Sequence, residues 1–114
     1  MLSEQTLQTA LEFRRARDWE QFHTPLNLAV AISVEAGELL ELFQWTKPGE
    51  ARPRKDQNLA VQHEIADLAI LLSDLAHDLG IDVDEAVRQK LDLNATRYPI
   101  DKARGRADKY DQLG

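Results

Sequence analysis

Apolar residues spaced four and three positions apart run from residue 61 to residue 79 of the chain. Positions three and four apart fall on one face of a helix, so this row predicts one long helix whose apolar seam packs in a bundle. The row consists of Val61, Ile65, Leu68, Leu72, Leu75 and Leu79. Few residues interrupt such helices, since the 114 residues include only five Gly and four Pro. The pattern favours an all-α fold.

Local signals set the expected ends of the first two helices. A weak helical stripe of apolar residues predicts a first helix from about Ser3 to Trp19. Thr24-Pro25 is a strong helix start, because Thr is a good N-cap and Pro suits the first helical position. The second helix should then reach about Trp45, before a loop that contains two Pro.

Two further helices are expected in the second half of the chain. Asp56 should cap the helix that carries the apolar row, and Gly80 should end it, because Gly tolerates the left-handed conformation found after many helices. Asp82 with Glu85 resembles a capping box, and the helix that it opens should reach about Tyr98. The prediction is an up-and-down bundle of four main helices with an irregular C-terminal tail.

Length and composition bound the class of protein. A chain of 114 residues with 43% apolar and 30% charged residues is typical of one globular domain, expected over residues 1–114. The absence of Cys excludes disulfides, thiolate zinc sites and a Cys nucleophile. No apolar run approaches the roughly 20 residues that cross a bilayer, and the first residues lack a secretion-signal pattern. We therefore expect a cytoplasmic protein without a membrane partner.

The charge of the chain is unevenly distributed. A net charge of −6 argues against nucleic acid as a partner, because binding a phosphate backbone needs clustered Lys and Arg. Nevertheless, seven of the 14 basic residues lie between Arg88 and Lys109. This basic end could hold a compact anion opposite an acidic middle, or it could be a solvated tail.

Two carboxylates interrupt the apolar pattern of the second expected helix. Glu35 lies in the row of Leu28, Ile32 and Leu39, where an aliphatic residue is expected, and Glu38 interrupts the neighbouring row. Burial of unpaired carboxylates costs several kcal/mol each, and two together repel one another. A divalent cation between Glu35 and Glu38 would remove both penalties.

A second acidic pair, Glu64 and Asp67, lies on the third expected helix. The pair belongs to a row of residues on one face of that helix, and this face could simply be exposed to solvent. The row is Ala60, Glu64, Asp67, Leu71, Asp74 and Asp78. A short loop, however, makes the second and third helices antiparallel neighbours, so the two pairs could face each other. The resulting cage of oxygen ligands suits Mg²⁺ or Mn²⁺, and Mg²⁺ in turn recruits substrate phosphates.

A di-iron carboxylate protein is the main alternative for a helical bundle with buried acids. That architecture needs two Glu-x-x-His motifs in mid-helix. Glu20 and His23 form the only such motif, and it lies beside a helix start. His63 and His77 have no Glu three residues before them. The sequence therefore disfavours a di-iron site.

The spacing Glu35-x-x-Glu38, 25 residues, then Glu64-x-x-Asp67 resembles the signature of the MazG-like all-α nucleoside triphosphate pyrophosphohydrolases. The surrounding segments resemble the dCTP pyrophosphatase branch over roughly residues 11 to 111. These segments are RDWEQFH at 17–23 with Pro25 and Asn27-Leu28, Glu38-Leu39, ELFQW at 41–45, Asn94-x-x-Arg97-Tyr98-Pro99, and Lys109-Tyr110.

The resemblance implies Mg²⁺-dependent hydrolysis of a (deoxy)nucleoside triphosphate, here dCTP or a modified dCTP, to the monophosphate and pyrophosphate, as sanitation of the nucleotide pool. It also implies a homodimer or homotetramer with active sites completed between chains. Its metal ligands would be Glu35, Glu38, Glu64 and Asp67. Its base-pocket residues would be Trp19, His23 and Trp45, and its phosphate-binding residues Lys90, Asn94 and Tyr98.

The residues themselves support these roles in part. Lys90, Asn94 and Tyr98 recur every four positions, so one helix face offers three donors to phosphate oxygens, unless it is only a polar outer face. Trp19 and Trp45 could stack a base or belong to the core.

For the chemical step, the expected water activator is a carboxylate not fully engaged with metal. The sequence alone does not select one of the four acids; the hypothesis is Glu38, with Glu35 beside it. Lys90 and Lys109 would stabilise the leaving pyrophosphate.

Leu71 stands where some relatives have an aromatic residue, which makes the base preference less secure than the reaction. The alternative function is a non-catalytic helical interaction module with a regulatory metal site.

Overall fold

The computed structural model describes residues 1–44 and 58–114. The described residues form helices and turns without strands, and four of the helices are long: α1 (Glu4–Ala16), α2 (Pro25–Glu41), α3 (Asn58–Asp78) and α4 (Val83–Arg97). The expected all-α fold is therefore confirmed. The described residues also form three short helices: η1 (Glu20–Phe22), α5 (Ile100–Ala103) and η3 (Tyr110–Gln112). No described helix is long and apolar enough to cross a membrane.

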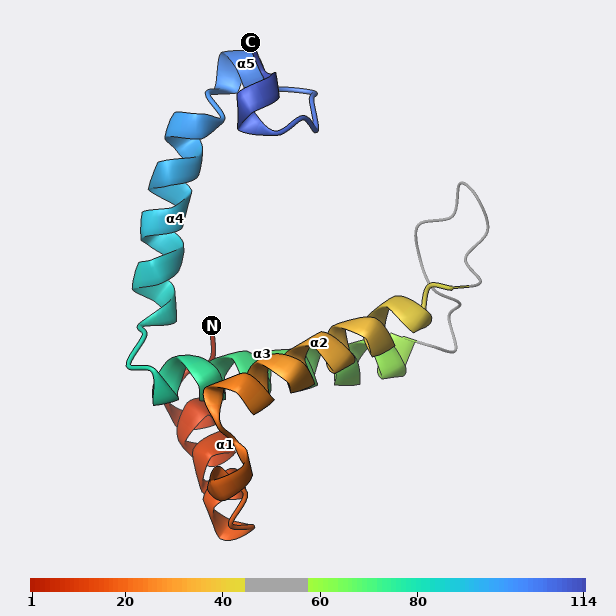
Figure 1. The fold of residues 1–114 in the computed structure, drawn as a ribbon, viewed down its shortest axis with the longest axis vertical. Coiled ribbons are helices and arrows are strands. Elements are labelled where there is room, and N and C mark those ends of the chain that lie inside the picture. The colour runs from red at the N-terminus through yellow and green to blue at the C-terminus, as the bar shows by residue number, and fades with distance from the viewer. Residues whose placement is uncertain (45–57) are drawn as a thin grey trace. The chain divides into compact units, whose positions relative to one another are not determined.

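The chain divides into two compact units, residues Met1–Ile81 and Asp82–Gly114. In the first unit α2 and α3 lie side by side, and α1 crosses this pair at the end where α2 begins and α3 ends (Figure 1). Its most buried large side chain is Leu28, near the start of α2, at 1% exposure. The second unit contains α4, α5 and η3, and Leu113 is its buried residue.

The ends of α1 and α2 follow from local chemistry. The side chain of Ser3 caps α1 by accepting the N–H of Thr6, and the helix ends at Ala16 rather than at Trp19 as expected. The reason is Asp18, whose φ of 55° is left-handed and cannot continue a helix. The predicted Thr24-Pro25 start is confirmed, with Thr24 Oγ1 accepting the N–H of Asn27 at 3.1 Å. The helix α2 ends at Glu41, and Trp45 lies outside the described residues.

The expected stop of α3 is also confirmed. Gly80 has a φ of +67°, its N–H donates to His77 O at 3.1 Å, and the N–H of Ile81 donates to Ala76 O at 2.8 Å. These two hydrogen bonds satisfy carbonyls at the helix end in the Schellman arrangement. Asp56, the predicted N-cap, lies outside the described residues.

Only half of the predicted capping box opens α4. Asp82 Oδ1 accepts the N–H of Glu85, whereas the Glu85 side chain pairs with Arg88 and Gln89. The tail beyond Pro99 is more ordered than expected. Tyr98 and Tyr110 meet edge to face with ring centroids 6.2 Å apart, which ties η3 to the end of α4.

The packing of α3 differs from the prediction. Its most buried residues are Ser73, Asp74 and Ala76, while the predicted seam residues Ile65, Leu72 and Leu79 are 54%, 42% and 52% exposed. The other reading, that the row with Asp74 is a wet face, is wrong for Asp74 itself, which is 2% exposed. Because α1 and α2 contact α3, part of its polar row is covered, and much of its apolar row is open within one chain.

Candidate metal and nucleotide site

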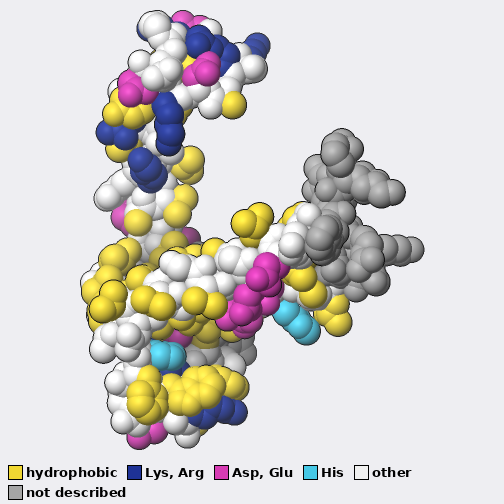
Figure 2. Space-filling model, turned by 45° about the vertical axis from the view of Figure 1, so that its right-hand side comes forward, with side chains coloured by type: hydrophobic (Ala, Val, Ile, Leu, Met, Phe, Trp, Pro, Cys, Tyr) yellow, Lys and Arg dark blue, Asp and Glu magenta, His cyan; other side chains and the backbone are white. Residues whose placement is uncertain are grey.

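Three acids from two neighbouring helices come together in the first unit. Glu35 projects from α2, and Glu64 and Asp67 project from α3; one carboxylate oxygen of each lies within 4.8 Å of the others. Glu35 and Glu64 are half-buried, and Asp67 is exposed. Figure 2 shows acidic side chains gathered on this helix pair beside hydrophobic ones. We call Glu35, Glu64 and Asp67 the acid cluster.

Crowding of negative charge shifts the protonation of the acids on α2. The carboxylate of Glu64 raises the pKa of Glu35, and partial burial adds to the effect. The neighbouring Glu35 in turn raises the pKa of Glu38. Like charges at short range favour the protonated form of one partner, so a cation is the natural way to keep all of these groups ionised.

One atom tests whether the acid cluster fits a metal. Glu64 Oε2 is buried and has no hydrogen-bond partner, an arrangement that is costly for a carboxylate oxygen. A hard cation would satisfy this oxygen, and the donor set of carboxylate oxygens without sulfur or imidazole suits Mg²⁺ or Mn²⁺. The residues present therefore fit the expected ion.

Glu38 has a different position from the other three predicted ligands. It is exposed, and it lies beside Glu35, one turn further along α2, without joining the acid cluster. The structure thus places three predicted metal ligands together and leaves the fourth at their edge. An exposed carboxylate beside the acid cluster is suited to contacting water.

The predicted base-pocket residues Trp19 and His23 lie next to each other in the connection between α1 and α2. Their ring centroids are 6.4 Å apart, and Trp19, 42% exposed, packs edge to face against Phe13 at 5.7 Å. The backbone N–H of Trp19 donates to Arg14 O at 3.1 Å, and His23 ends η1. Trp45, the third predicted member, lies outside the described residues.

The predicted phosphate-binding residues belong to the second unit. Lys90 is exposed on α4, Asn94 is half-buried there, and Tyr98 caps the end of that helix. Lys109 is exposed immediately before η3. Arg97, whose guanidinium lies 4.6 Å from the Tyr110 ring centroid, adds a cation near Tyr98. The part of these residues in phosphate binding stays a prediction.

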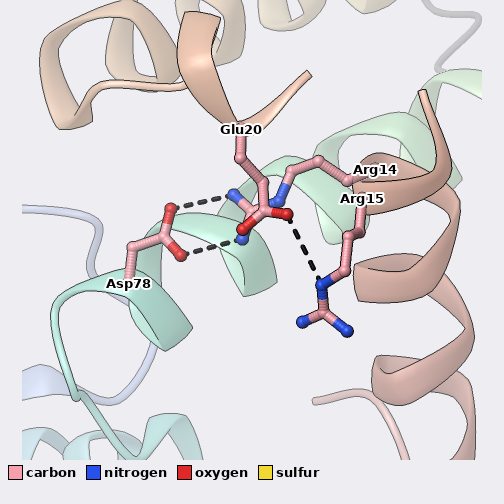
Figure 3. A network of polar contacts seen from close by, with 4 residues as sticks. All are labelled: Arg14, Arg15, Glu20 and Asp78. Atoms are coloured by element: carbon pink, nitrogen blue, oxygen red, sulfur yellow. Dashed lines mark hydrogen bonds and ion pairs between the residues drawn. The ribbon is translucent and has the colours of Figure 1, made fainter. Parts of the chain in front are cut away.

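Sequence reasoning missed an ion pair between α1 and α3 that engages a buried Arg. Arg14, 5% exposed, donates two hydrogen bonds of 2.8 Å to the two carboxylate oxygens of Asp78 (Figure 3). Beside it, Arg15 pairs with Glu20 at 3.5 Å. The signal was the position of Arg14 within the apolar stripe of the first helix, which a solvated Arg would not occupy.

The chain is similar to proteins named dCTP pyrophosphatase 1. It is 48% identical over 106 residues to dCTP pyrophosphatase 1 of Mus musculus, and that match covers 90% of the chain and 62% of the relative. The human dCTP pyrophosphatase 1 is 45% identical over 105 residues, again with 90% and 62% covered. The chain thus spans 62% of the length of these curated relatives.

A solved structure has the same fold. A pyrophosphatase from Archaeoglobus fulgidus DSM 4304 superposes with a TM-score of 0.71 at 40% sequence identity, covering 84% of this chain and 91% of that one. The sequence profile of the MazG-like family matches residues 30–113, which include the acid cluster and all of the second unit except its last residue. The chain belongs to the MazG-like family.

Proposed function

We propose that the chain hydrolyses a (deoxy)nucleoside triphosphate, with dCTP or a base-modified dCTP preferred, to the monophosphate and pyrophosphate. The observation that carries this proposal is the acid cluster with the unpartnered Glu64 oxygen. Membership of the MazG-like family and the likeness to proteins named dCTP pyrophosphatase 1 support the reaction and the base.

Glu35, Glu64 and Asp67 would hold Mg²⁺, with Mn²⁺ as a substitute, and Glu38 would complete or border the set. When bound there, the ion supplies neutralising charge for triphosphate oxygens. The partial burial of Glu35 and Glu64 keeps bulk water away from two of the ligands. It therefore strengthens their electrostatic interactions.

Side chains of the protein would then accept the proton from water and stabilise the leaving group. Glu38 accepts a proton from water; the water oxygen forms a new bond to phosphorus, and the bond to the bridging oxygen between the α- and β-phosphates breaks. Glu38 is exposed and lies beside the acid cluster, a position suited to a carboxylate that contacts water. Lys90 and Lys109 would stabilise the negative charge of the departing pyrophosphate.

The remaining predicted contacts concern binding. Trp19, His23 and Trp45 would hold the base, and the adjacent rings of the first two support this assignment. Asn94 and Tyr98 would donate hydrogen bonds to phosphate oxygens. Leu71, half-buried on α3, offers an aliphatic surface where an aromatic ring would stack.

We also propose that the chain forms a homodimer or a homotetramer. The support is the apolar surface that one chain leaves open on α2 and α3. Leu26 and Leu40 of α2 are each 72% exposed, and the Ile65, Leu72 and Leu79 row of α3 is exposed as well. Large apolar surfaces of this kind mark interaction sites.

A nucleotide panel tests the reaction. The purified chain is incubated with Mg²⁺ and each of the common deoxynucleoside and ribonucleoside triphosphates, and pyrophosphate release is measured. We expect dCTP to release pyrophosphate faster than any other nucleotide in the panel. This release should disappear when EDTA removes the metal. An absence of release from every nucleotide would overturn the enzyme proposal and favour an interaction module with a regulatory metal site.

A further inference from the structure

The first helix ends in a turn that fixes the backbone of Trp19. Asp18 has the left-handed φ of 55°, its N–H donates to Arg15 O at 3.0 Å, and the N–H of Trp19 donates to Arg14 O at 3.1 Å. Together these features form a Schellman motif, with Asp18 in the position where Gly is common. The motif satisfies carbonyls in the last turn of α1 and holds Trp19 at a defined place after the helix.

The ring of Trp19 is held as well as its backbone. In a Schellman motif the side chain that follows the turn often contacts an apolar side chain of the last helical turns. Here Trp19 packs edge to face against Phe13, with ring centroids 5.7 Å apart. The guanidinium of Arg17 lies 3.5 Å from the centroid of the Phe13 ring and also donates to Phe13 O at 3.1 Å. Trp19 nevertheless stays 42% exposed, so its indole keeps surface for a second flat group.

The same turn is attached to α3. Leu11 and Arg14 are the two buried residues of α1, and their spacing of three places them on one face of the helix. While the carbonyl of Arg14 accepts the Trp19 N–H, its guanidinium donates two hydrogen bonds of 2.8 Å to Asp78 of α3 (Figure 3). A single residue therefore connects Asp78 to the backbone of Trp19.

The helix that anchors this turn also carries two residues of the acid cluster. Asp78 follows Asp67 by eleven residues, which is roughly 16 Å along the axis of α3. A nucleoside triphosphate carries its base and its phosphates on opposite sides of the sugar, so an enzyme for it must fix the spacing between two subsites. With Trp19 attached near one end of α3 and metal ligands further along it, one helix would set that spacing.

We propose that the turn at the end of α1, anchored to α3 by Arg14 and Asp78, positions the Trp19 ring to stack on the nucleotide base. The inference rests on the proposed function and adds Asp18, Arg14 and Asp78 to it as positioning residues. A left-handed φ is uncommon for a residue with a Cβ and persists where the surrounding structure enforces it. Gln21 contributes here, since its Nε2 donates to Asp18 O at 3.0 Å and to Asp18 Oδ2 at 2.9 Å.

Amide exchange tests the turn without substrate. The chain has two Trp, so labelling the full chain with ¹⁵N-tryptophan gives two backbone amide signals, and Trp19→Phe identifies that of Trp19. This amide should be protected in the wild type. In Asp18→Val it should exchange at least about tenfold faster, the order of one lost hydrogen bond, because a β-branched residue disfavours a left-handed φ.

Asp18→Gly is the rescuing variant for this experiment. Gly adopts a left-handed φ readily, so the Trp19 amide should regain its protection although the carboxylate is gone. An unprotected Trp19 amide in the wild type would overturn the proposal, as would equal exchange rates in Asp18→Val and Asp18→Gly.

Kinetics test the consequence for the base. KM for dCTP should rise at least about fivefold in Asp18→Val and in Asp78→Asn, the lower end for one base-stacking contact, with kcat within about twofold of wild type. Asp18→Gly should keep the wild-type KM. Inhibition by pyrophosphate, which has no base, should be unchanged in all three variants. An unchanged KM in Asp18→Val would overturn the proposal, as would an equal rise in the inhibition constant of pyrophosphate.

Ser3→Ala is the matched control for lost stability. Ser3 caps the opposite end of α1, where its side chain accepts the N–H of Thr6 at 3.2 Å. The variant should lower Tm and leave both the Trp19 amide exchange and KM for dCTP at their wild-type values. A rise in KM equal to that of Asp18→Val would reduce the turn to a structural role and overturn the proposal. If no nucleotide is hydrolysed, the proposed function fails, and calorimetric binding of dCMP to the same variants decides the role of the turn.

Discussion

Glu38 is exposed and lies beside the acid cluster without joining it, and this position predicts its role in catalysis. The variant Glu38→Gln removes the basic oxygen and keeps the size of the side chain. Pyrophosphate release from dCTP should fall by at least about 100-fold, the usual contribution of a positioned base. Helix content, measured by circular dichroism, should remain that of the wild type, because Glu38 is exposed.

Glu41→Gln is the control for this variant. Glu41 is exposed, ends α2 and lies outside the acid cluster, so its neutralisation should leave turnover within about twofold of wild type. Full activity of Glu38→Gln would show that this carboxylate takes no part in the reaction.

The sequence singles out some of the clustered and buried acids more clearly than others. Glu35 interrupts an apolar row, so the anomaly is visible in the sequence, and the structure places it half-buried beside Glu64. Glu64 and Asp67 lie in a row that would suit a solvated helix face, and only their pairing with α2 distinguishes them. The burial of Asp74 was not predictable in this way, since it depends on what α1 and α2 cover.

At the scale of the helices, two glycines should respond oppositely to Ala. At Gly80 the φ of +67° is the obstacle, because an added Cβ has open space there, so Gly80→Ala should destabilise by about 1 kcal/mol. Gly37 lies within α2, again with open space for a Cβ, so Gly37→Ala should stabilise by up to about 1 kcal/mol. Urea unfolding measures both. A destabilising Gly37→Ala would indicate a contact that this single chain does not show.

The ion pair that attaches α1 to α3 predicts that the free energy of unfolding depends on pH. Hydrogen bonds from Arg14 lower the pKa of Asp78, so its contribution to stability is present above the unfolded pKa of about 4 and is lost as the pH falls through the folded pKa. Asp78→Asn should therefore lower the free energy of unfolding at pH 7 by about 2 kcal/mol, between the values for surface and fully buried pairs.

Urea unfolding at several pH values tests this prediction. The deficit of Asp78→Asn should shrink as the pH falls below about 4 and through the lowered folded pKa of Asp78, where the wild-type carboxylate is also neutralised. Glu12→Gln, an exposed acid on α1, should change the free energy of unfolding by less than about 0.5 kcal/mol. A deficit that is the same at every pH would mean that packing, not charge, holds Asp78 in place.

Helix ends were predictable because their causes are local. Thr24-Pro25, Gly80 and Asp82 act on backbone groups within a few residues, and the structure shows each at a helix end. The end of α1 was placed too late, because nothing in the residue type of Asp18 requires a left-handed φ. Its conformation follows from the turn that leads to η1, with Gln21 Nε2 donating to Asp18 O and Oδ2.

At the scale of the whole molecule, we predict that the exposed apolar row of α3 forms the interface between copies of the chain. Ile65→Glu combined with Leu72→Glu should convert an oligomer to monomers, as measured by light scattering after size-exclusion chromatography, because both positions are exposed in one chain. Ala66→Glu adds charge to the same helix at an exposed position about 100° around it from Ile65, and the oligomer should persist. Assembly that resists the double substitution would rule out this row as the interface.

The same row explains why sequence periodicity misjudged the core. A spacing of three and four identifies an apolar face but not the partner that covers it. Within one chain, α3 presents Asp74 and Ser73 to its neighbours and leaves Ile65 and Leu72 open. The sequence thus identifies an apolar row without identifying which surface, if any, covers it.

The bond between Arg14 and Asp78 joins residues that are 64 positions apart in the chain. Its formation must wait for closure of a long loop, whereas the caps at Ser3, Thr24 and Asp82 each close three residues. Helix formation therefore comes early in folding, and the arrival of α1 on α3 comes late. A change at Asp78 should act mainly by hastening unfolding, which makes this bond a determinant of the protein's lifetime rather than of its folding speed.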